Sequence, residues 1–133
     1  MRIFFSILSI AYIAGLFLFA DSPVVTTLSK FNPDSILHIP LYGILTVLLI
    51  FCFFPMRFKS NNPINPTNST TRFLVVGFIA LIVGIADEIH QAYVPGRDAS
   101  VTDVLLDLVG IIIVLFCAFR LSKTKANAFP KKL

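Results

Sequence analysis

The sequence predicts an all-α membrane protein with four transmembrane helices. Of its 133 residues, 56% are hydrophobic and only 14% are charged, whereas about a quarter of the residues in a soluble domain are charged. The mean hydropathy is +0.87. The apolar residues form four long runs, and Lys and Arg lie mostly between or after them. At this length we expect one domain, residues 1–133.

The four runs predict helices over residues 3–20, 34–54, 72–93 and 100–120. A membrane-spanning helix needs about 20 mostly apolar residues, and the first, second and fourth runs fit that length. The third run is apolar only from Phe73 to Ala86. It is long enough only if its helix continues through Asp87, Glu88 and Gln91, so these polar residues are predicted to lie within a span.

Helix-start and turn signals separate these runs. Asn32, Pro33 and Asp34 suit the start of the second helix, since they supply a cap, a first-turn proline and an acid at the positive end of the helix dipole. Ser100 and Asp103 resemble a capping box before the fourth helix. Pro95 and Gly96 mark a turn between the third and fourth helices. Asp34, Ser100 and Gly96 therefore each have a structural explanation beside any functional one.

The positions of Lys and Arg predict the orientation in the membrane. Loops 21–35 and 87–100 hold only two of the 11 basic residues, Lys30 and Arg97. By the positive-inside rule, both termini, the 55–72 loop and a basic tail over 121–133 are expected in the cytoplasm. Topology thus accounts for the net charge of +4, and we expect no nucleic-acid partner. The other nine basic residues lie on the predicted cytoplasmic side: Arg2, Arg57, Lys59, Arg72, Arg120, Lys123, Lys125, Lys131 and Lys132.

All seven acidic residues lie toward the opposite, outer side. At 1.5 Å per residue, a helix that enters the membrane at Phe73 has risen about 21 Å at Asp87. The hydrocarbon core is about 30 Å thick, so Asp87 and Glu88 are expected roughly 9 Å inside its outer boundary. The same rise places Asp107 about 10 Å inside. Ionisable groups at such depth usually face the interior of a helix bundle and pair with one another.

Helical spacing predicts that these groups converge, because residues three and four apart share a helix face. Asp34 and His38 share one face, Gly84, Asp87 and Gln91 a second, and Asp103, Asp107 and Gly110 a third. The first helix has no ionisable residue between Ile3 and Ala20 and is expected to contribute only apolar packing. Pro95, Gly96, Gly84 and Gly110 are expected to act structurally. No metal or cofactor is predicted; a divalent metal held by the carboxylates is left open, with Arg97 as a cation that would compete with it. The predicted polar cluster comprises Asp34, His38, Asp87, Glu88, Gln91, Arg97, Ser100, Asp103 and Asp107.

Two segments resemble the VanZ-like membrane protein family. Residues 87–110 contain its D-E-x-x-Q, P-G-R and S-x-x-D pattern in order, and residues 34–42 are similar to its D-K-x-x-H-x-x-x-Y motif. Two residues depart from the family pattern: Ser35 stands where lysine is usual, and Asp107 where asparagine is usual. The first departure removes a cation from the cluster, and the second adds a potential anion.

The resemblance implies a small multi-pass protein of the prokaryotic cell membrane. The family is named for a member associated with glycopeptide antibiotic resistance. The name alone does not predict that this chain confers resistance.

Three functions remain open. As a binding module, the cluster would take a lipid headgroup, a lipid-linked envelope precursor or an amphiphilic antibiotic. Arg97 would then clamp a phosphate or carboxylate, or else neutralise the surrounding acids. As an enzyme, His38, Asp87, Glu88 and Asp107 would supply acid–base groups, although the H-E-x-x-H and G-x-S-x-G motifs are absent. As a structural bundle, the cluster would join the helices or form one end of a proton path. The oligomeric state is left open.

Overall fold

The computed structural model describes residues 2–20, 22, 27, 36–54, 66–95, 97 and 99–127, without the side chains of 66–68 and 124–127. Within these residues the fold is all-α, which confirms that prediction. It comprises four helices and no strand: α1 (Arg2–Leu18), α3 (His38–Phe53), α4 (Pro66–Gln91) and α5 (Val101–Asn127).

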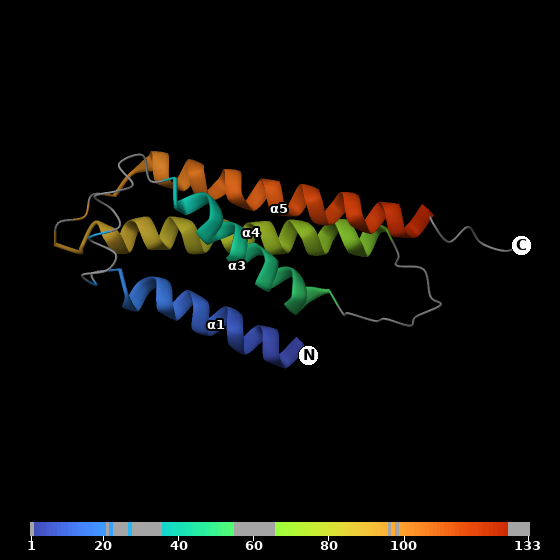
Figure 1. Ribbon diagram of the computed structural model, residues 1–133, viewed down its shortest axis with the longest axis horizontal. Coiled ribbons are helices and arrows are strands. Elements are labelled where there is room, and N and C mark those ends of the chain that lie inside the picture. Colours follow the sequence, from blue (N-terminus) through green and yellow to red (C-terminus); the bar gives the residue numbers. More distant parts are fainter. Residues whose placement is uncertain are drawn as a thin grey trace, which may run out of the picture.

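The helices form an antiparallel bundle around α3. Figure 1 shows α4 and α5 side by side along the long axis, with α3 crossing them at an angle. Helix α3 packs against all three other helices, whereas the described part of α1 contacts only α3 and α4. The C-terminal ends of α1 and α4 lie at the same end of the bundle as the first residues of α3 and α5, on the left in Figure 1. This end carries the predicted polar residues.

Two of the helices are long and apolar enough to cross a membrane, judged by length and composition. Their candidate spans are Ser69–Gln91 in α4 and Val101–Lys123 in α5. Helices α1 and α3 are apolar but have only 17 and 16 residues. At 1.5 Å per residue they are about 26 and 24 Å long, against a hydrocarbon core of about 30 Å. The described residues therefore contain two candidate spans, whereas the sequence predicted four.

The helix bounds differ from the predicted ones for local reasons. Helix α4 begins at Pro66, six residues before the predicted start at 72, because proline suits a first helical position whose N–H has no partner in the helix. Helix α5 continues to Asn127, beyond the predicted end at 120. In this last part the Lys123 ammonium lies 4.5 Å from the centroid of the Phe119 ring, and such pairs four residues apart support a helix.

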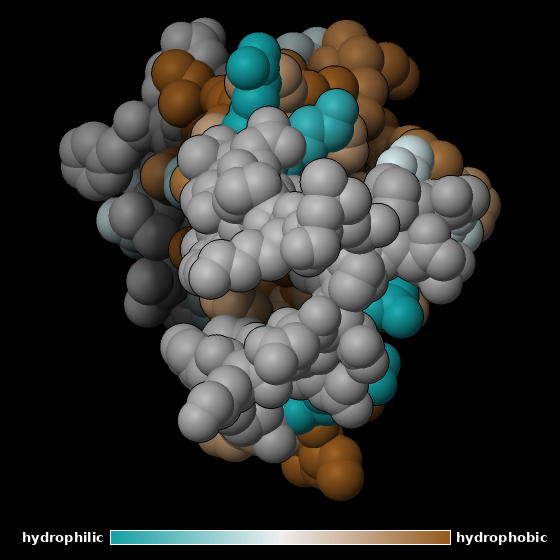
Figure 2. Space-filling model, turned by 90° about the vertical axis from the view of Figure 1, so that its right-hand side faces the viewer, coloured by the Kyte–Doolittle hydropathy of each residue, from teal (hydrophilic) through white to brown (hydrophobic). Residues whose placement is uncertain are grey.

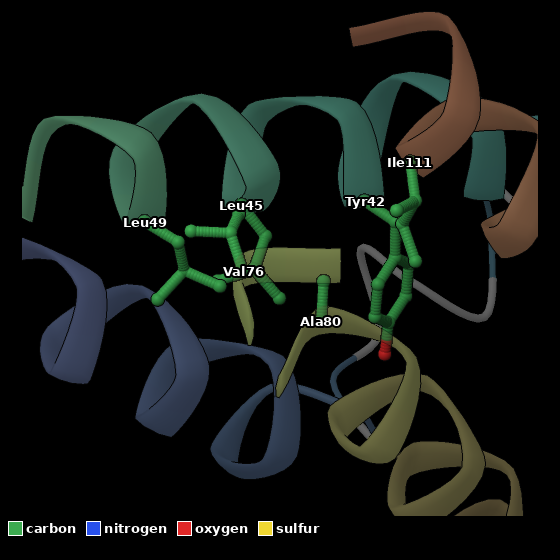
Figure 3. Close-up of a cluster of buried hydrophobic side chains, with 6 residues drawn as sticks. All are labelled: Tyr42, Leu45, Leu49, Val76, Ala80 and Ile111. Carbon is green, nitrogen blue, oxygen red and sulfur yellow. The ribbon is translucent and has the colours of Figure 1, made fainter. Parts of the chain in front are cut away.

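The apolar core joins α3, α4 and α5 (Figure 3). The Tyr42 side chain extends from α3 toward α4 with its hydroxyl at the far end, so this ring links the core to the polar cluster. Many large apolar side chains outside the core face outward, and brown residues reach the outline of the molecule in Figure 2. An apolar surface of this extent is typical of a protein that faces lipid or a partner. The core residues are Tyr42, Leu45, Leu49, Val76, Ala80 and Ile111.

Helices α3 and α5 approach most closely at Gly110. A Cβ atom at this position would collide with the carbonyl oxygen of Ile39, and it would lie 3.1 Å from the Ile39 Cα atom. Ile39 follows His38, and Gly110 lies one helical turn after Asp107. This close backbone contact therefore holds His38 against Asp107, in line with the structural role predicted for Gly110.

Candidate functional site

Six polar side chains are buried together where α3, α4 and α5 meet. They are His38, Asp87, Glu88, Gln91, Asp103 and Asp107, and each is at most 8% exposed. All six belong to the polar cluster predicted from the sequence, five of them by helical spacing and Glu88 by its expected depth. Arg97 and Ser100 contact members of this group, whereas Asp34 lies outside the described residues.

The first part of the cluster centres on an imidazole. We call His38, Glu88, Asp103 and Asp107 the His38 network. His38 Nδ1 lies 2.8 Å from Asp107 Oδ1, and His38 Nε2 lies 3.8 Å from Asp103 Oδ2. One side-chain ligand atom each from His38, Glu88 and Asp103 lies within 4.8 Å of the other two. Asp107 is fully buried, so its carboxylate depends on His38 for hydrogen bonding.

The second part of the cluster is a chain of hydrogen bonds. We call Tyr42, Asp87, Gln91 and Arg97 the Asp87 network. Arg97 Nη2 donates to Gln91 Oε1 at 2.6 Å, and Gln91 Nε2 donates to Asp87 Oδ2 at 3.0 Å. The Tyr42 hydroxyl also donates to Asp87 Oδ2, at 3.3 Å. Tyr42 was not among the predicted site residues, although its spacing of four from His38 signals a shared helix face.

Arg97 forms no ion pair with any carboxylate that the structure describes. Of its two predicted roles, direct neutralisation of the described acids is therefore not observed. Its guanidinium donates one hydrogen bond to the Gln91 side-chain amide. Arg97 also lines a pocket between α1, α3 and α4. Gln91 is the one side-chain partner of this guanidinium among the described residues, so its other donors can serve a ligand.

The start of α5 differs from the predicted capping box. Ser100 Oγ accepts the Thr102 N–H at 3.1 Å, as an N-cap should. The Ser100 N–H, however, donates to Glu88 Oε2 of α4 at 2.9 Å, in place of the predicted bond to Asp103. Because Glu88 takes this capping role across the helix interface, Asp103 is free to face His38.

Glycine and the turn before α5 shape the cluster. A Cβ atom at Gly84 would lie 2.7 Å from Asp107 Oδ2, so the absence of a side chain lets this carboxylate rest against α4. Pro95 is exposed in the turn, and the Arg97 N–H donates to the Val94 carbonyl there. Gly96 lies outside the described residues.

A pocket of about 410 Å³ opens beside the cluster, between α1, α3 and α4. Its polar lining is His38, Asp87, Gln91 and Arg97, and its apolar lining comes mainly from α1. The expectation that the first helix contributes only apolar packing is wrong in part, because a polar group of α1 forms a hydrogen bond with α3. The Tyr12 hydroxyl of α1 donates to the Leu41 carbonyl at 2.9 Å. The remaining lining residues are Ala11, Tyr12, Gly15, Leu16, Phe19, Ala20 and Leu41.

Residues 5–122 match the VanZ/LLP1 family. The chain belongs to the VanZ/LLP1 family. The match spans both segments that carry the sequence resemblance, which it confirms. No curated protein and no solved structure matches the chain.

This VanZ/LLP1 protein leaves several buried carboxylate oxygens without hydrogen-bond partners. Within the described residues these are Asp87 Oδ1, Glu88 Oε1 and Asp107 Oδ2. A buried charge is strongly destabilising unless it is paired. Among the described residues, the one cationic candidate within 4 Å of any of these three carboxylates is His38, which lies beside Asp107. His90 lies outside the cluster and packs on the Phe17 ring. The cluster therefore has unused capacity for a proton, a cation or a polar ligand.

Proposed function

We propose that the chain is a four-span protein of the prokaryotic cell membrane, with both termini in the cytoplasm and the polar cluster in the outer leaflet. The arrangement of the helix ends supports this topology. Basic residues that the structure describes at the end away from the cluster include Arg2, Arg72, Arg120 and Lys123, and such residues favour the cytoplasmic side. Helices α1 and α3 would span a locally thinned bilayer or be extended by flanking residues.

Cysteine labelling tests this topology. In a background with Cys52 and Cys117 replaced by alanine, we expect Ala99→Cys to react with a membrane-impermeant maleimide added to intact cells. Lys123→Cys should react only after the membrane is permeabilised, because it lies at the opposite end of α5. Both positions are exposed, so burial does not limit either reaction. Labelling of Lys123→Cys from outside would reverse the proposed orientation.

We further propose that the pocket binds an amphiphile with an acidic polar group. The candidates are a membrane lipid bound by its headgroup, a lipid-linked envelope precursor and an amphiphilic antibiotic. One observation carries this proposal: a single pocket joins the Arg97 guanidinium to an apolar wall from α1. Its volume of about 410 Å³ falls within the range of small-molecule sites, about 300–1,000 Å³. Arginine is well suited to hold a phosphate or carboxylate because its planar fork donates two parallel hydrogen bonds.

Lipid retention by the Arg97→Gln variant tests the pocket. We expect native mass spectrometry in detergent to show that the wild type retains phosphatidylglycerol more strongly than phosphatidylcholine. In the variant, the affinity for phosphatidylglycerol relative to phosphatidylcholine should fall by about tenfold, equivalent to about 1.4 kcal/mol of binding free energy. Arg97→Lys should bind weakly because it keeps the charge but lacks the fork. Arg120→Gln, at the other end of the bundle, is the matched control. An equal loss in that control would indicate a general charge effect and contradict a site at Arg97.

Acid–base catalysis is the second candidate function, favoured by the contact between His38 and Asp107. A carboxylate that orients an imidazole from its Nδ1 side leaves Nε2 able to exchange a proton with a ligand, and His38 lines the pocket. Incubation with lipid phosphate esters, followed by mass spectrometry of the products, separates the two functions. Turnover that disappears in His38→Gln while lipid retention persists would favour an enzyme.

A further inference from the structure

We infer that the His38 network is a binding site for a divalent transition-metal ion, held by His38 Nε2 and by the carboxylates of Glu88 and Asp103. This site shares only His38 with the proposed amphiphile pocket and does not depend on a ligand there. The three donor residues come from α3, α4 and α5, so the ion would join three helices. All three are buried, which distinguishes them from acidic groups on a surface.

The distances between the donors suit a shared ion. One ligand atom from each residue lies within 4.8 Å of the others. His38 Nε2 and Asp103 Oδ2 are 3.8 Å apart, which is too long for a hydrogen bond. Metal–ligand bonds of about 2.0–2.2 Å at a tetrahedral angle place two donor atoms about 3.4 Å apart. A small closure of the observed gap would therefore bring both atoms into coordination.

Asp107 prepares the imidazole for this role. His38 Nδ1 lies 2.8 Å from Asp107 Oδ1. An ionised carboxylate can only accept hydrogen bonds, so beside an ionised Asp107 the imidazole proton is on Nδ1. The lone pair is then on Nε2, which lies on the side of Asp103. A carboxylate behind the imidazole is the usual outer-shell arrangement of a metal-bound histidine.

Charge and hydrogen bonding at Glu88 also point to a cation. Its Oε2 atom accepts the Ser100 N–H, whereas its buried Oε1 atom has no partner among the described residues. Only 5% of the Glu88 surface is exposed. Arg97, the cation expected to compete for this position, is engaged with Gln91 instead. An ion beside Glu88 would satisfy the free oxygen and offset two carboxylate charges.

The donor set indicates the class of ion. One imidazole nitrogen with two carboxylates suits Zn²⁺, Fe²⁺ or Mn²⁺ better than Mg²⁺ or Ca²⁺, which prefer oxygen donors alone. Three protein donors leave at least one coordination position open to water or a ligand, as in catalytic rather than structural zinc sites.

Metal titration of the full chain, purified in detergent and treated with a chelator, tests the inference. With Zn²⁺ or Mn²⁺ as the probe, we expect one ion per chain. His38→Asn, which keeps a donor for Asp107 but lacks Nε2, should weaken binding by more than about 100-fold, as should Glu88→Gln and Asp103→Asn. Wild-type protein that takes up neither ion at micromolar concentration would overturn the inference.

Matched variants of the Asp87 network serve as controls. Asp87→Asn removes a neighbouring buried carboxylate, and Arg97→Gln removes the proposed lipid clamp, yet both should leave metal affinity within about threefold. Equal loss in Asp87→Asn would place the ion elsewhere and overturn the assignment. X-ray absorption of the wild type, which needs no variant to fold, should show imidazole nitrogen and carboxylate oxygen ligands. A sulfur ligand would instead place the ion at a cysteine.

Discussion

Replacing Asp107 by alanine is expected to lower the free energy of unfolding by about 3 kcal/mol, the combined effect of an unsatisfied buried donor and a cavity. Asp107 is fully buried, and its Oδ1 atom lies 2.8 Å from His38 Nδ1. Alanine would leave the imidazole without this acceptor and would open a void against Gly84. Reversible unfolding in detergent, followed by circular dichroism, measures the change.

Asp107→Asn is the matched control for this prediction. Its amide oxygen can still accept the His38 Nδ1–H, and it fills nearly the same volume. We therefore expect its unfolding free energy to fall by about 1 kcal/mol at most, the net contribution of a typical hydrogen bond. Asparagine is also the residue that the VanZ-like pattern usually has at this position. If alanine and asparagine destabilise the protein equally, the hydrogen bond to His38 is not what makes Asp107 important.

Replacing Gly110 by alanine is expected to lower the free energy of unfolding by about 3 kcal/mol, the upper end of the usual range for overpacking. The added methyl group would meet backbone atoms of Ile39, which cannot rotate away as a flexible side chain could. The α3–α5 interface must then separate, and His38 moves away from Asp107. Loss of metal or lipid binding should therefore accompany the loss of stability.

Gly43→Ala provides the same chemical change in the same interface. A Cβ atom at Gly43 would lie 3.6 Å from Val114 Cγ2, an ordinary van der Waals contact. We expect Gly43→Ala to be neutral or stabilising, since alanine favours a helix by about 1 kcal/mol relative to glycine. Unfolding curves of the two variants in the same detergent give a direct comparison. Similar destabilisation by both would show that the interface tolerates no added volume anywhere.

The two networks within the cluster separate the two proposals experimentally. The Asp87 network ends at Arg97 in the pocket, whereas the His38 network contains the inferred metal donors. Arg97→Gln should therefore change lipid retention alone, and Glu88→Gln should change metal affinity alone. His38 belongs to one network and lines the pocket as well, so its variants are expected to affect both measurements.

Local periodicity was sufficient to predict much of this protein. An apolar run of given length predicts a helix, and a spacing of three or four residues places side chains on one face whatever the tertiary structure. This is why His38, Asp87, Gln91, Asp103 and Asp107 could be grouped from the sequence. Because a charge surrounded by lipid is costly, a membrane protein with this pattern is expected to turn these faces inward.

The partners of these residues depend on contacts between helices, which local periodicity does not contain. The Ser100 N–H bonds Glu88 rather than Asp103, because α4 brings a carboxylate to the start of α5. Arg97 contacts Gln91 rather than an acid, because the turn after α4 directs it there. The apolar wall from α1 was missed because it has no ionisable residue to signal it. Only the packing of α1 against α3 and α4 turned the polar cluster into one side of a pocket.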